Sequence, residues 1–428
     1  MSEREHFGSR AAVIMAMAGS AIGLGNIWRF PYMVGEYGGA AFILIYIICS
    51  FVLSFPIFLS EAVVGRKSHA NAIGAMKKLA PGTLWTLVGI LNVITPTIIV
   101  SYYSIVGGWS MEYFLKSFSL NFGEFQPSGW AAFIFNTIFL ATSAGIVAIG
   151  VKGGIEKFNK ISIPVLFVLI VMIAIYALNM PGADKGVDYL VKPDFSKMTG
   201  KTFVYALGQS FYSMSVGMGI IITYSSYVHK EENLLASGIG TVLAGLVFAV
   251  LAGFAIMPAV FSAGIAPSSG PGLIFQTLPH VFSSMGATIP WLSNVVAVLF
   301  FLTVIVAALT SSISLIEVGV AFLVEEKGIK RSWACMIVFI VAWLLGLASV
   351  FSIKFFGKVD AFSSNILLTI GALVIVLFVG WKMKKEDIRQ EITNGGKVNS
   401  KAFGVLYFLI KYIAPIAVLT IIITTFVL

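Results

Sequence analysis

The sequence has 428 residues, of which 58% are hydrophobic and only 11% are charged, and its mean hydropathy is +0.96. A water-soluble protein of this length needs far more charge to cover its surface, so this composition excludes that class and indicates a membrane protein. The net charge of +9 would suit a nucleic-acid partner, but the distribution of the basic residues gives another explanation.

Long apolar runs follow one another along the whole chain. A helix that crosses a bilayer needs about 20 mostly apolar residues. Eleven runs meet this length, at roughly 10–34, 39–65, 84–115, 128–150, 161–181, 202–226, 234–261, 290–324, 332–353, 360–381 and 403–428. The first run lacks a small-residue cleavage site, so we expect a span rather than a signal peptide. The sequence therefore predicts one all-α membrane domain, 1–428, with eleven transmembrane helices.

The basic residues lie mainly in alternate loops. If the N-terminus is cytoplasmic, far more Lys and Arg residues fall in the inner segments than in the outer ones. This is the positive-inside bias of multi-pass proteins. It predicts a multi-pass protein of the cell membrane with a cytoplasmic N-terminus, and it explains the basic charge by the lipid bilayer without nucleic acid. The oligomeric state stays open.

Signatures of enzymes and metalloproteins are missing from the sequence. The four histidines are scattered, and none is paired at metal-ligand spacing. Cys49 and Cys335 fall inside apolar runs, where we expect small buried thiols rather than a disulfide. Gly23 and Gly25 could belong to a dinucleotide loop, but they follow no strand. We therefore expect no enzyme.

Two of the apolar runs are interrupted in the middle. The first contains MAGSAIGLGNIWRFP (17–31), and the sixth contains QSFYSMSVGMG (209–219). Glycines spaced as GxxxG can serve helix packing alone. Breaks in corresponding runs of two halves are instead typical of inverted-repeat transporters. The pattern predicts an inverted 5+5 repeat with broken helices 1 and 6, composed of 1–181, 200–384 and an extra helix, 401–428.

A broken helix exposes backbone groups at its centre. Carbonyls are freed where the first half ends, and N–H groups are freed where the second half begins. Inside a bilayer these groups are tolerated only where they line a site. The carbonyl end suits a cation and the amide end suits an anion. We expect carbonyls near Gly19, Ala21 and Ile22 to hold Na⁺, and the amides of Leu24 and Gly25 to bind an anionic substrate group.

Longer motifs point to a known family. They read AMAGSAIGLGNIWRFP, GGAAFILIYI, GQSFYSMSVGMG, ITYSSYV, GPGLIFQTLP and ALTSSIS. Together they resemble the neurotransmitter:sodium symporters, in particular their bacterial hydrophobic amino-acid transporters, from about Arg4 to the last run. The resemblance implies Na⁺-coupled import of neutral hydrophobic L-amino acids by alternating access. A substrate-sensing receptor or channel on the same fold, or a proton-coupled amino-acid carrier, are the alternatives.

The resemblance also implies ion sites. One sodium site would use the carbonyls of Gly19, Ile22 and Ala307 and the hydroxyls of Thr310 and Ser311. The other would use the Ala21 carbonyl, the Asn26 side chain, Ser213 and the substrate carboxylate. Gly245 departs from the family pattern there, because relatives carry Asn or Asp at this position. Back-bonding of the hydroxyls to their own helix is the structural alternative for the first set.

Chloride is a further possibility that the resemblance implies. Chloride-dependent relatives bind the anion with a Tyr, a Gln and two Ser, and they lack an acid on the seventh span. This sequence offers Tyr46, Gln209 and Ser213, with Ala249 in the fourth position, and 234–260 contains no Asp or Glu. We expect either chloride-stimulated transport or a weak or unused second sodium site. The alternative is that the substrate carboxylate alone supplies enough negative charge.

The substrate pocket implied by the resemblance lies between the two breaks. The substrate carboxylate would meet the Leu24 and Gly25 amides and the Tyr103 hydroxyl, and Gly23 leaves room for it where monoamine carriers have aspartate. The remaining substrate-binding residues are Ser20, Ala21, Ile99, Tyr212, Ser213, Ser215, Met218, Ser311 and Leu315. This mostly apolar wall, with an adaptable methionine, predicts fairly large hydrophobic side chains.

Charged residues in or near the spans are expected to form gates, because an unpaired charge is costly there. By resemblance, Arg29 and Asp360 form the outer gate. The inner gate would be formed by Arg4, Ser226, Tyr227 and Glu325. We expect Glu61 to brace the unwound sixth span, the alternative being a place at the cytosolic interface near Arg66. The apolar loop 262–289 is expected to cover the outer vestibule.

Overall fold

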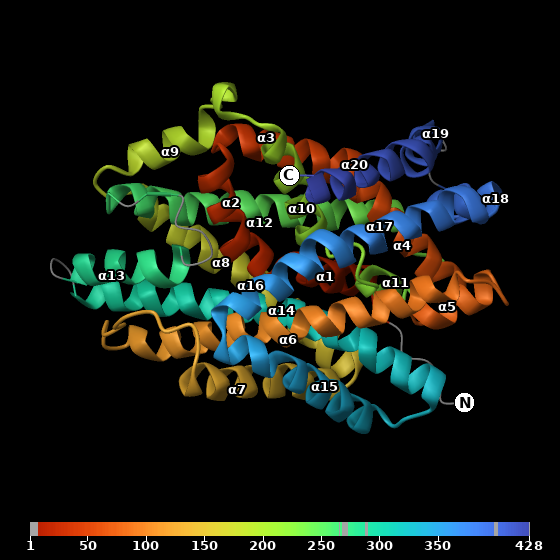
Figure 1. Cartoon of the computed structure of the whole chain (residues 1–428), viewed down its shortest axis with the longest axis horizontal. Coiled ribbons are helices and arrows are strands. Elements are labelled where there is room, and N and C mark those ends of the chain that lie inside the picture. Colours follow the sequence, from red (N-terminus) through yellow and green to blue (C-terminus); the bar gives the residue numbers. More distant parts are fainter. Residues whose placement is uncertain (1–6, 265, 268–272, 287–289, 398–400, 428) are drawn as a thin grey trace.

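The computed structural model describes residues 7–264, 266–267, 273–286, 290–397 and 401–427. Within these ranges the chain is helical throughout, with no strand. The long helices lie roughly side by side along the horizontal axis of Figure 1, and the short segments α1, α10 and α11 lie in the middle of the bundle. The connecting helices α9 and α13 lie at one end of the bundle, and α5 and α18 lie at the other (Figure 1).

Most α-helices follow one another closely, and the irregular segment 118–129 separates α6 from α7. Their bounds are α1 (Arg10–Ala21), α2 (Phe30–Tyr37), α3 (Ala40–Cys49), α4 (Phe55–Ser68), α5 (Ala72–Leu79), α6 (Thr86–Ser117), α7 (Trp130–Ala148), α8 (Lys157–Leu178), α9 (Ala183–Val191), α10 (Gly200–Ser213), α11 (Ile220–Ser225), α12 (Leu234–Ser262), α13 (Leu278–Gly286), α14 (Pro290–Lys327), α15 (Arg331–Phe351), α16 (Ile353–Phe362), α17 (Leu368–Leu377), α18 (Lys385–Ile392), α19 (Lys401–Phe408) and α20 (Ala414–Val427). Several spans also contain π-helical turns, among them η1 (Gly25–Arg29), η3 (Val151–Glu156), η8 (Phe378–Lys382) and η9 (Leu409–Ile413).

The prediction of an all-α multi-span protein is confirmed, with a lower number of spans. In the described part of the chain, nine helices are long and apolar enough to cross a membrane, and a tenth span results if the bent pair Ala11–Ala21 and Gly25–Tyr37 is counted as one. The two members of that pair meet at 45°, so the first span is broken as predicted. The predicted sixth run corresponds to α10 and α11, and neither is long enough to span alone.

Backbone conformation explains both interruptions. Helix α1 ends because Ile22 adopts an extended conformation (φ −92°, ψ 90°), and a regular helix resumes only at Phe30, after η1. Between α10 and α11, Ser215, Gly217 and Gly219 have φ values of +53°, +80° and +70°. A right-handed helix cannot continue through such left-handed residues. The chain around 214–219 is therefore held open rather than wound.

The unwound segment after α10 is braced by a carboxylate from α4. Glu61 is fully buried, and its Oε1 accepts a hydrogen bond of 2.6 Å from the Gly217 amide. This confirms the expected bracing role of Glu61. Gly217 also fits closely against α17, since a Cβ at this position would lie 2.2 Å from the Leu368 carbonyl oxygen. The broken span is thus fixed from two sides. Cys49 and Cys335 are free and buried, as predicted.

Candidate functional site

A cavity lies between the two breaks. Its empty volume, which includes space open to solvent, is about 330 Å³. It is lined by Ser20, Ala21, Gly23, Gly25, Ile99, Tyr103, Tyr212, Ser215, Met218, Ile220, Ser311 and Leu315. Ten of the twelve predicted substrate-binding residues are in this lining. Leu24 and Ser213 are not part of the lining, and Gly23 and Ile220 line the cavity in addition.

Close packing at the first break requires glycine. The Leu24 amide donates a hydrogen bond of 3.0 Å to the Tyr103 hydroxyl, so α6 reaches the amide end of the break. A Cβ at Gly23 would lie 1.9 Å from Ser311 Oγ and 3.0 Å from the Tyr103 hydroxyl oxygen. A Cβ at Gly25 would lie 2.7 Å from the Tyr212 ring. Backbone groups and a hydroxyl therefore line this end of the cavity, with no room for a side chain from the break itself.

One wall of the cavity is formed by serine hydroxyls. Ser215 Oγ and Ser311 Oγ both donate to the Ser20 carbonyl, over 2.9 and 3.2 Å. The hydroxyls of Ser20 and Tyr212 are buried and have no protein partner. A buried polar atom without a partner costs about 1–3 kcal/mol. These two hydroxyls are therefore available to a bound molecule.

A cluster of oxygens lies at the carbonyl end of the first break. Thr310 Oγ1 lies 3.0 Å from the Ile22 carbonyl oxygen and 2.9 Å from that of Ala307, and all three residues are fully buried. Neutral oxygens in a dry site suit a hard cation. Of the other two residues predicted for this set, Ser311 bonds to Ser20, while Gly19 faces α8, where a Cβ would lie 2.6 Å from Asn159 Oδ1.

A second group of polar atoms surrounds Asn26. The side-chain nitrogen of Asn26, Nδ2, donates to the Ala21 carbonyl over 2.9 Å and to the Gly245 carbonyl over 3.4 Å. Asn26 Oδ1 is buried and has no protein partner, so it is free to coordinate a cation. A Cβ at Gly245 would meet nothing nearer than 3.8 Å. A Cβ at Gly245 would thus make ordinary contacts with Ala21 and Asn26, so this position adjoins the second set. Ser213, the third predicted member, bonds to Gln209 instead.

The three residues predicted for chloride lie next to one another. Gln209 Nε2 donates to Ser213 Oγ over 3.0 Å and to the Gly25 carbonyl over 2.7 Å. The Tyr46 hydroxyl lies in hydrogen-bonding contact with Ser213. Ala249 is buried on α12. The group thus joins α3 and α10 behind the first break.

The outer gate residues have separate partners in this structure. The Arg29 guanidinium donates to Gln209 Oε1 over 2.8 Å and lies 5.1 Å from the centre of the Tyr212 ring. Asp360 Oδ1 accepts a hydrogen bond of 3.2 Å from Ser364. Arg29 is therefore held by α10, directly beside the cavity, and sequence patterns did not indicate this Gln209 contact.

The inner gate residues are distributed over several contacts, and Arg4 lies outside the described residues. Glu325 Oε2 accepts from the backbone and side-chain amides of Asn71, over 2.8 and 3.0 Å. The Ser226 carbonyl lies 3.4 Å from His69 Nδ1. The Tyr227 carbonyl accepts from the Phe7 amide over 3.3 Å. The predicted inner-gate residues are thus tied to the N-terminal segment and to the turn between α4 and α5.

Sequence patterns did not indicate two further residues, Glu317 and Arg331. Glu317 is fully buried on α14, and its carboxylate bonds to the Tyr227 hydroxyl over 2.8 Å and to both terminal nitrogens of Arg331. An acid inside the apolar run 290–324 indicates a functional or paired residue in the sequence. Its partner Arg331 follows only from the packing of α15 against α14. Arg331 also donates to the Val147 carbonyl at the end of α7 over 2.8 Å.

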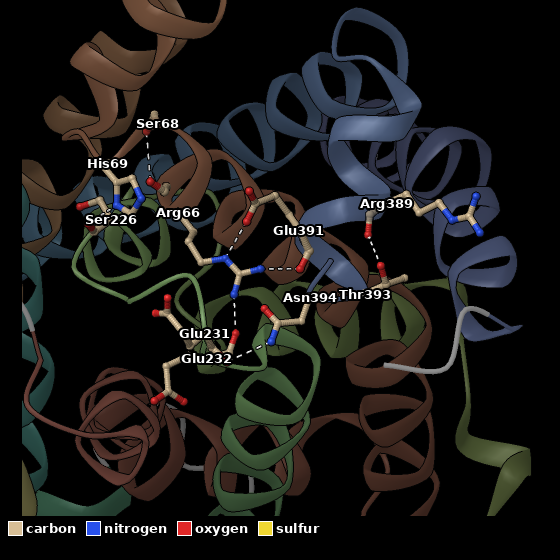
Figure 2. Close-up of polar contacts among 11 residues, drawn as sticks. Arg66, Ser68, His69, Ser226, Glu231, Glu232, Arg389, Glu391, Thr393 and Asn394 are labelled. Atoms are coloured by element: carbon tan, nitrogen blue, oxygen red, sulfur yellow. Dashed lines mark hydrogen bonds and ion pairs between the residues drawn. The ribbon is translucent and has the colours of Figure 1, made fainter. Parts of the chain in front are cut away.

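A further inner connection joins three segments through Arg66 (Figure 2). This buried guanidinium bonds to the Glu391 carboxylate and carbonyl and to the Glu232 carbonyl. Asn394 reaches the Glu231 carbonyl over 2.9 Å. The end of α4, the loop after α11 and the helix α18 are therefore linked at one point.

A multi-span helical protein with a cavity and two oxygen clusters at broken spans belongs, by its architecture, to the membrane transporters rather than the enzymes. Its sequence matches the model of the sodium:neurotransmitter symporter family over residues 4–127 and 123–428. The chain belongs to that family.

Relatives and solved structures agree with this assignment. The sodium-dependent transporter YhdH of Bacillus subtilis is 35% identical, with 98% of this chain and 97% of the relative covered. A sodium-dependent transporter of Haemophilus influenzae is 34% identical, with 99% and 98% covered. The crystal structure of MhsT in complex with L-phenylalanine superimposes with a TM-score of 0.89 at 35% identity, covering 99% of this chain and all of MhsT.

Proposed function

We propose that this protein is a symporter that uses the Na⁺ gradient to import neutral hydrophobic L-amino acids by alternating access. The observation that carries the proposal is the shared break at residues 22–25. Its carbonyl end, at Ile22, lies against the Thr310 and Ala307 oxygens, while its amide end, at Leu24, lies against Tyr103 and the cavity. An ion and a substrate bound at these two ends would organise the same few residues.

The lining of the cavity supports the choice of substrate. None of the lining residues is charged, so a substrate carboxylate would be balanced by backbone amides, the Tyr103 hydroxyl and a nearby cation. Ile99, Met218, Ile220 and Leu315 give an apolar wall for the substrate side chain. The solved relative MhsT holds L-phenylalanine, which fits a wall of this kind.

Coupling would follow from the geometry of the break. A Na⁺ at the Ile22, Ala307 and Thr310 oxygens fixes the carbonyl end of the break and so orders the amides that meet the substrate. By linkage, the substrate then strengthens Na⁺ binding by the same factor. A second Na⁺ near Asn26 would touch the substrate carboxylate itself.

The finer topology belongs to the same proposal. Counting α10 and α11 as one broken sixth span gives eleven spans, with inverted repeats at 1–181 and 200–384 and an extra helix at 401–428. The breaks at 22–24 and 214–219 support this division, because they fall in corresponding spans of the two repeats. The basic loops support a cytoplasmic N-terminus in the bacterial inner membrane.

Uptake by the purified full-length chain in proteoliposomes tests the proposal. An inward Na⁺ gradient is imposed, and radiolabelled neutral amino acids are screened, with an equal K⁺ gradient as the control. We expect concentrative uptake of hydrophobic members under Na⁺ alone. Uptake of the same size under K⁺, or no uptake of any neutral amino acid, would contradict the proposal.

The outer gate gives a prediction of its own. Asp360→Asn is expected to reduce coupled uptake severalfold while leaving equilibrium substrate binding nearly unchanged, because the residue acts in closing the path above the cavity. Uptake and scintillation-proximity binding are compared on the same preparation, with Ser364→Ala as the control for the loss of the Asp360 hydrogen bond. Equal losses of binding and uptake would argue against a gating role.

The chloride group gives a second prediction. Uptake in chloride is expected to exceed uptake in gluconate, because an anion among Tyr46, Gln209 and Ser213 would offset the positive charge of bound Na⁺. Ala249→Glu should remove the stimulation by supplying a fixed negative charge, whereas Ala249→Gln should keep it. Equal uptake in both salts, with two Na⁺ bound per substrate, would leave the substrate carboxylate as the only balancing charge.

A further inference from the structure

A lysine ammonium lies among three aromatic rings where the π-helical turns η8 and η9 pack against each other. Lys411 belongs to the π-helical turn η9, and its Nζ lies 4.8 Å from the centre of the Trp381 ring, 5.6 Å from that of Tyr412 and 5.7 Å from that of Tyr407. Lys385 Nζ lies 5.2 Å from the centre of the same Tyr407 ring. Both ammonium groups therefore lie near the Tyr407 ring.

Backbone contacts hold this group in place. Trp381 Nε1 donates to the Lys411 carbonyl over 3.1 Å, and the Tyr407 hydroxyl donates to the Gly380 carbonyl over 3.3 Å. A Cβ at Gly380 would lie 3.0 Å from the Lys411 Cα, which is tighter than an ordinary contact, so glycine favours this close approach of the two helical turns. Lys411, Trp381, Tyr407 and Tyr412 together form an aromatic cage. The packing of the two helical turns holds this cage in place.

The cage lies on the surface that faces the lipid. Lys411 falls within the candidate span Ala402–Thr424, and Trp381 is the second-last residue of the candidate span Ile353–Lys382 and is 61% exposed. The exposed apolar side chains of this last span recur every three or four residues, at Val405, Phe408, Tyr412, Ile416, Leu419 and Ile423. Such a stripe faces outward. Trp and Tyr are enriched at the level of the lipid headgroups, and Trp381 lies at the end of its span. Lys411 lies nine residues inside the span Ala402–Thr424, and the long lysine side chain can extend along apolar surface toward the headgroups.

Around the cage there are four lysines, Lys382, Lys384, Lys385 and Lys411, and two acids, Glu386 and Asp387, which follow Lys385 on α18. In the described part of the chain, neither Lys385 nor Lys411 lies within 4 Å of a carboxylate, whereas Lys67, Lys77 and Lys160 do form ion pairs. Aromatic rings stabilise an ammonium through their faces, but they leave its three N–H donors without oxygen acceptors. A charge at a membrane span is costly without a partner. The exposed Lys382 and Lys384 add further positive charge next to the cage.

We propose that this surface binds one anionic phospholipid, with its phosphate between Lys385 and Lys411 and its acyl chains along the stripe from Phe408 to Ile423. The phosphate supplies the oxygen acceptors that both ammonium groups lack, and its charge complements the basic residues. The apolar stripe beside the cage distinguishes a lipid from a soluble phosphate, because it provides surface for the hydrocarbon chains.

The bound lipid would also stabilise the inner connection of Figure 2. Lys385 is the first residue of α18, and Glu391 on the same helix holds Arg66. The same end of α18 is already tied to α4 by the ion pair of Asp387 with Lys67 over 3.1 Å, and a headgroup on Lys385 would add a further contact there. The lipid is expected to raise the stability of the inner face, not only to occupy a surface.

Thermal unfolding and native mass spectrometry of the purified full-length chain test this proposal. The protein in neutral detergent is titrated with phosphatidylglycerol, with zwitterionic phosphatidylcholine, and with inorganic phosphate. We expect only phosphatidylglycerol to raise the Tm and to be retained at about one molecule per chain. Lys385→Gln with Lys411→Gln should lose most of that shift, and the corresponding double substitution to Arg should keep it. The single variant Lys385→Gln changes an exposed residue and should fold normally. It is expected to lose part of the Tm shift caused by phosphatidylglycerol, even if the double variant folds poorly.

Removal of the same charge elsewhere provides the control. Lys157→Gln with Lys330→Gln removes two exposed lysines from other loops of the same predicted face, and its response to phosphatidylglycerol should equal that of the wild type. A retained shift in the Lys385 and Lys411 variants would overturn the proposal. So would an equal loss in the control, an equal shift with inorganic phosphate, or lipid retention confined to a dimer, which would place the lipid at an interface between copies.

Discussion

Gly23→Ala is expected to abolish substrate binding and uptake, with a loss of at least about 100-fold, or ~2.7 kcal/mol. The added Cβ would lie 1.9 Å from Ser311 Oγ and 3.0 Å from the Tyr103 hydroxyl oxygen, so it would occupy the amide end of the break and displace two polar groups that line the cavity. Equilibrium binding of the substrate found in the uptake screen measures the effect.

Gly208→Ala is the matched control for this substitution. Gly208 lies on the other broken span, and a Cβ there would meet nothing within 4 Å. Binding by this variant should equal that of the wild type. If Gly23→Ala binds substrate with wild-type affinity, the carboxylate does not occupy the space beside Gly23, and the proposed orientation of the substrate is wrong.

Thr310→Ala combined with Ser311→Ala is expected to abolish Na⁺-driven uptake, again by about 100-fold or more. Thr310 contributes the hydroxyl oxygen that lies between the Ile22 and Ala307 carbonyls, and backbone carbonyls alone cannot replace it. The Na⁺ dependence of uptake measures the effect, because a weakened site requires higher Na⁺ before any substrate is transported.

Ser312→Ala serves as the control for the double variant. The Ser312 hydroxyl is buried but has no protein partner, so its removal breaks no described contact. Its Na⁺ dependence should match that of the wild type. A Thr310 and Ser311 double variant that still concentrates substrate under a Na⁺ gradient would show that the ion binds elsewhere.

The features that the sequence predicts well are those set by local physics. Spans such as 84–115 are recognisable because hydrocarbon requires a long apolar helix, and α6 covers this range closely. The broken first span is predictable because glycines at 19, 23 and 25 weaken a helix at a depth where no water replaces its hydrogen bonds. The cavity residues follow from the same breaks, combined with motifs of a known family.

Contacts that depend on how distant helices pack could not be predicted. Arg29 bonds to Gln209, 180 residues away, and no periodicity indicates this pair. Arg66 meets Glu391 across 325 residues in the same way. The number of candidate spans in the described residues is lower than the number of apolar runs, because positive φ angles divide the sixth run into pieces that are too short to span alone.

The central claim is that Na⁺ and substrate move together through the site at the first break, and a coupled flux measurement tests it most directly. Entry of ²²Na⁺ into proteoliposomes is recorded with and without external substrate, alongside substrate entry in the same vesicles, for the wild type and for the Thr310 and Ser311 double variant. The account predicts that substrate stimulates Na⁺ entry in a fixed ratio in the wild type and that this stimulation is lost in the variant. Substrate entry without any accompanying Na⁺ flux would contradict it.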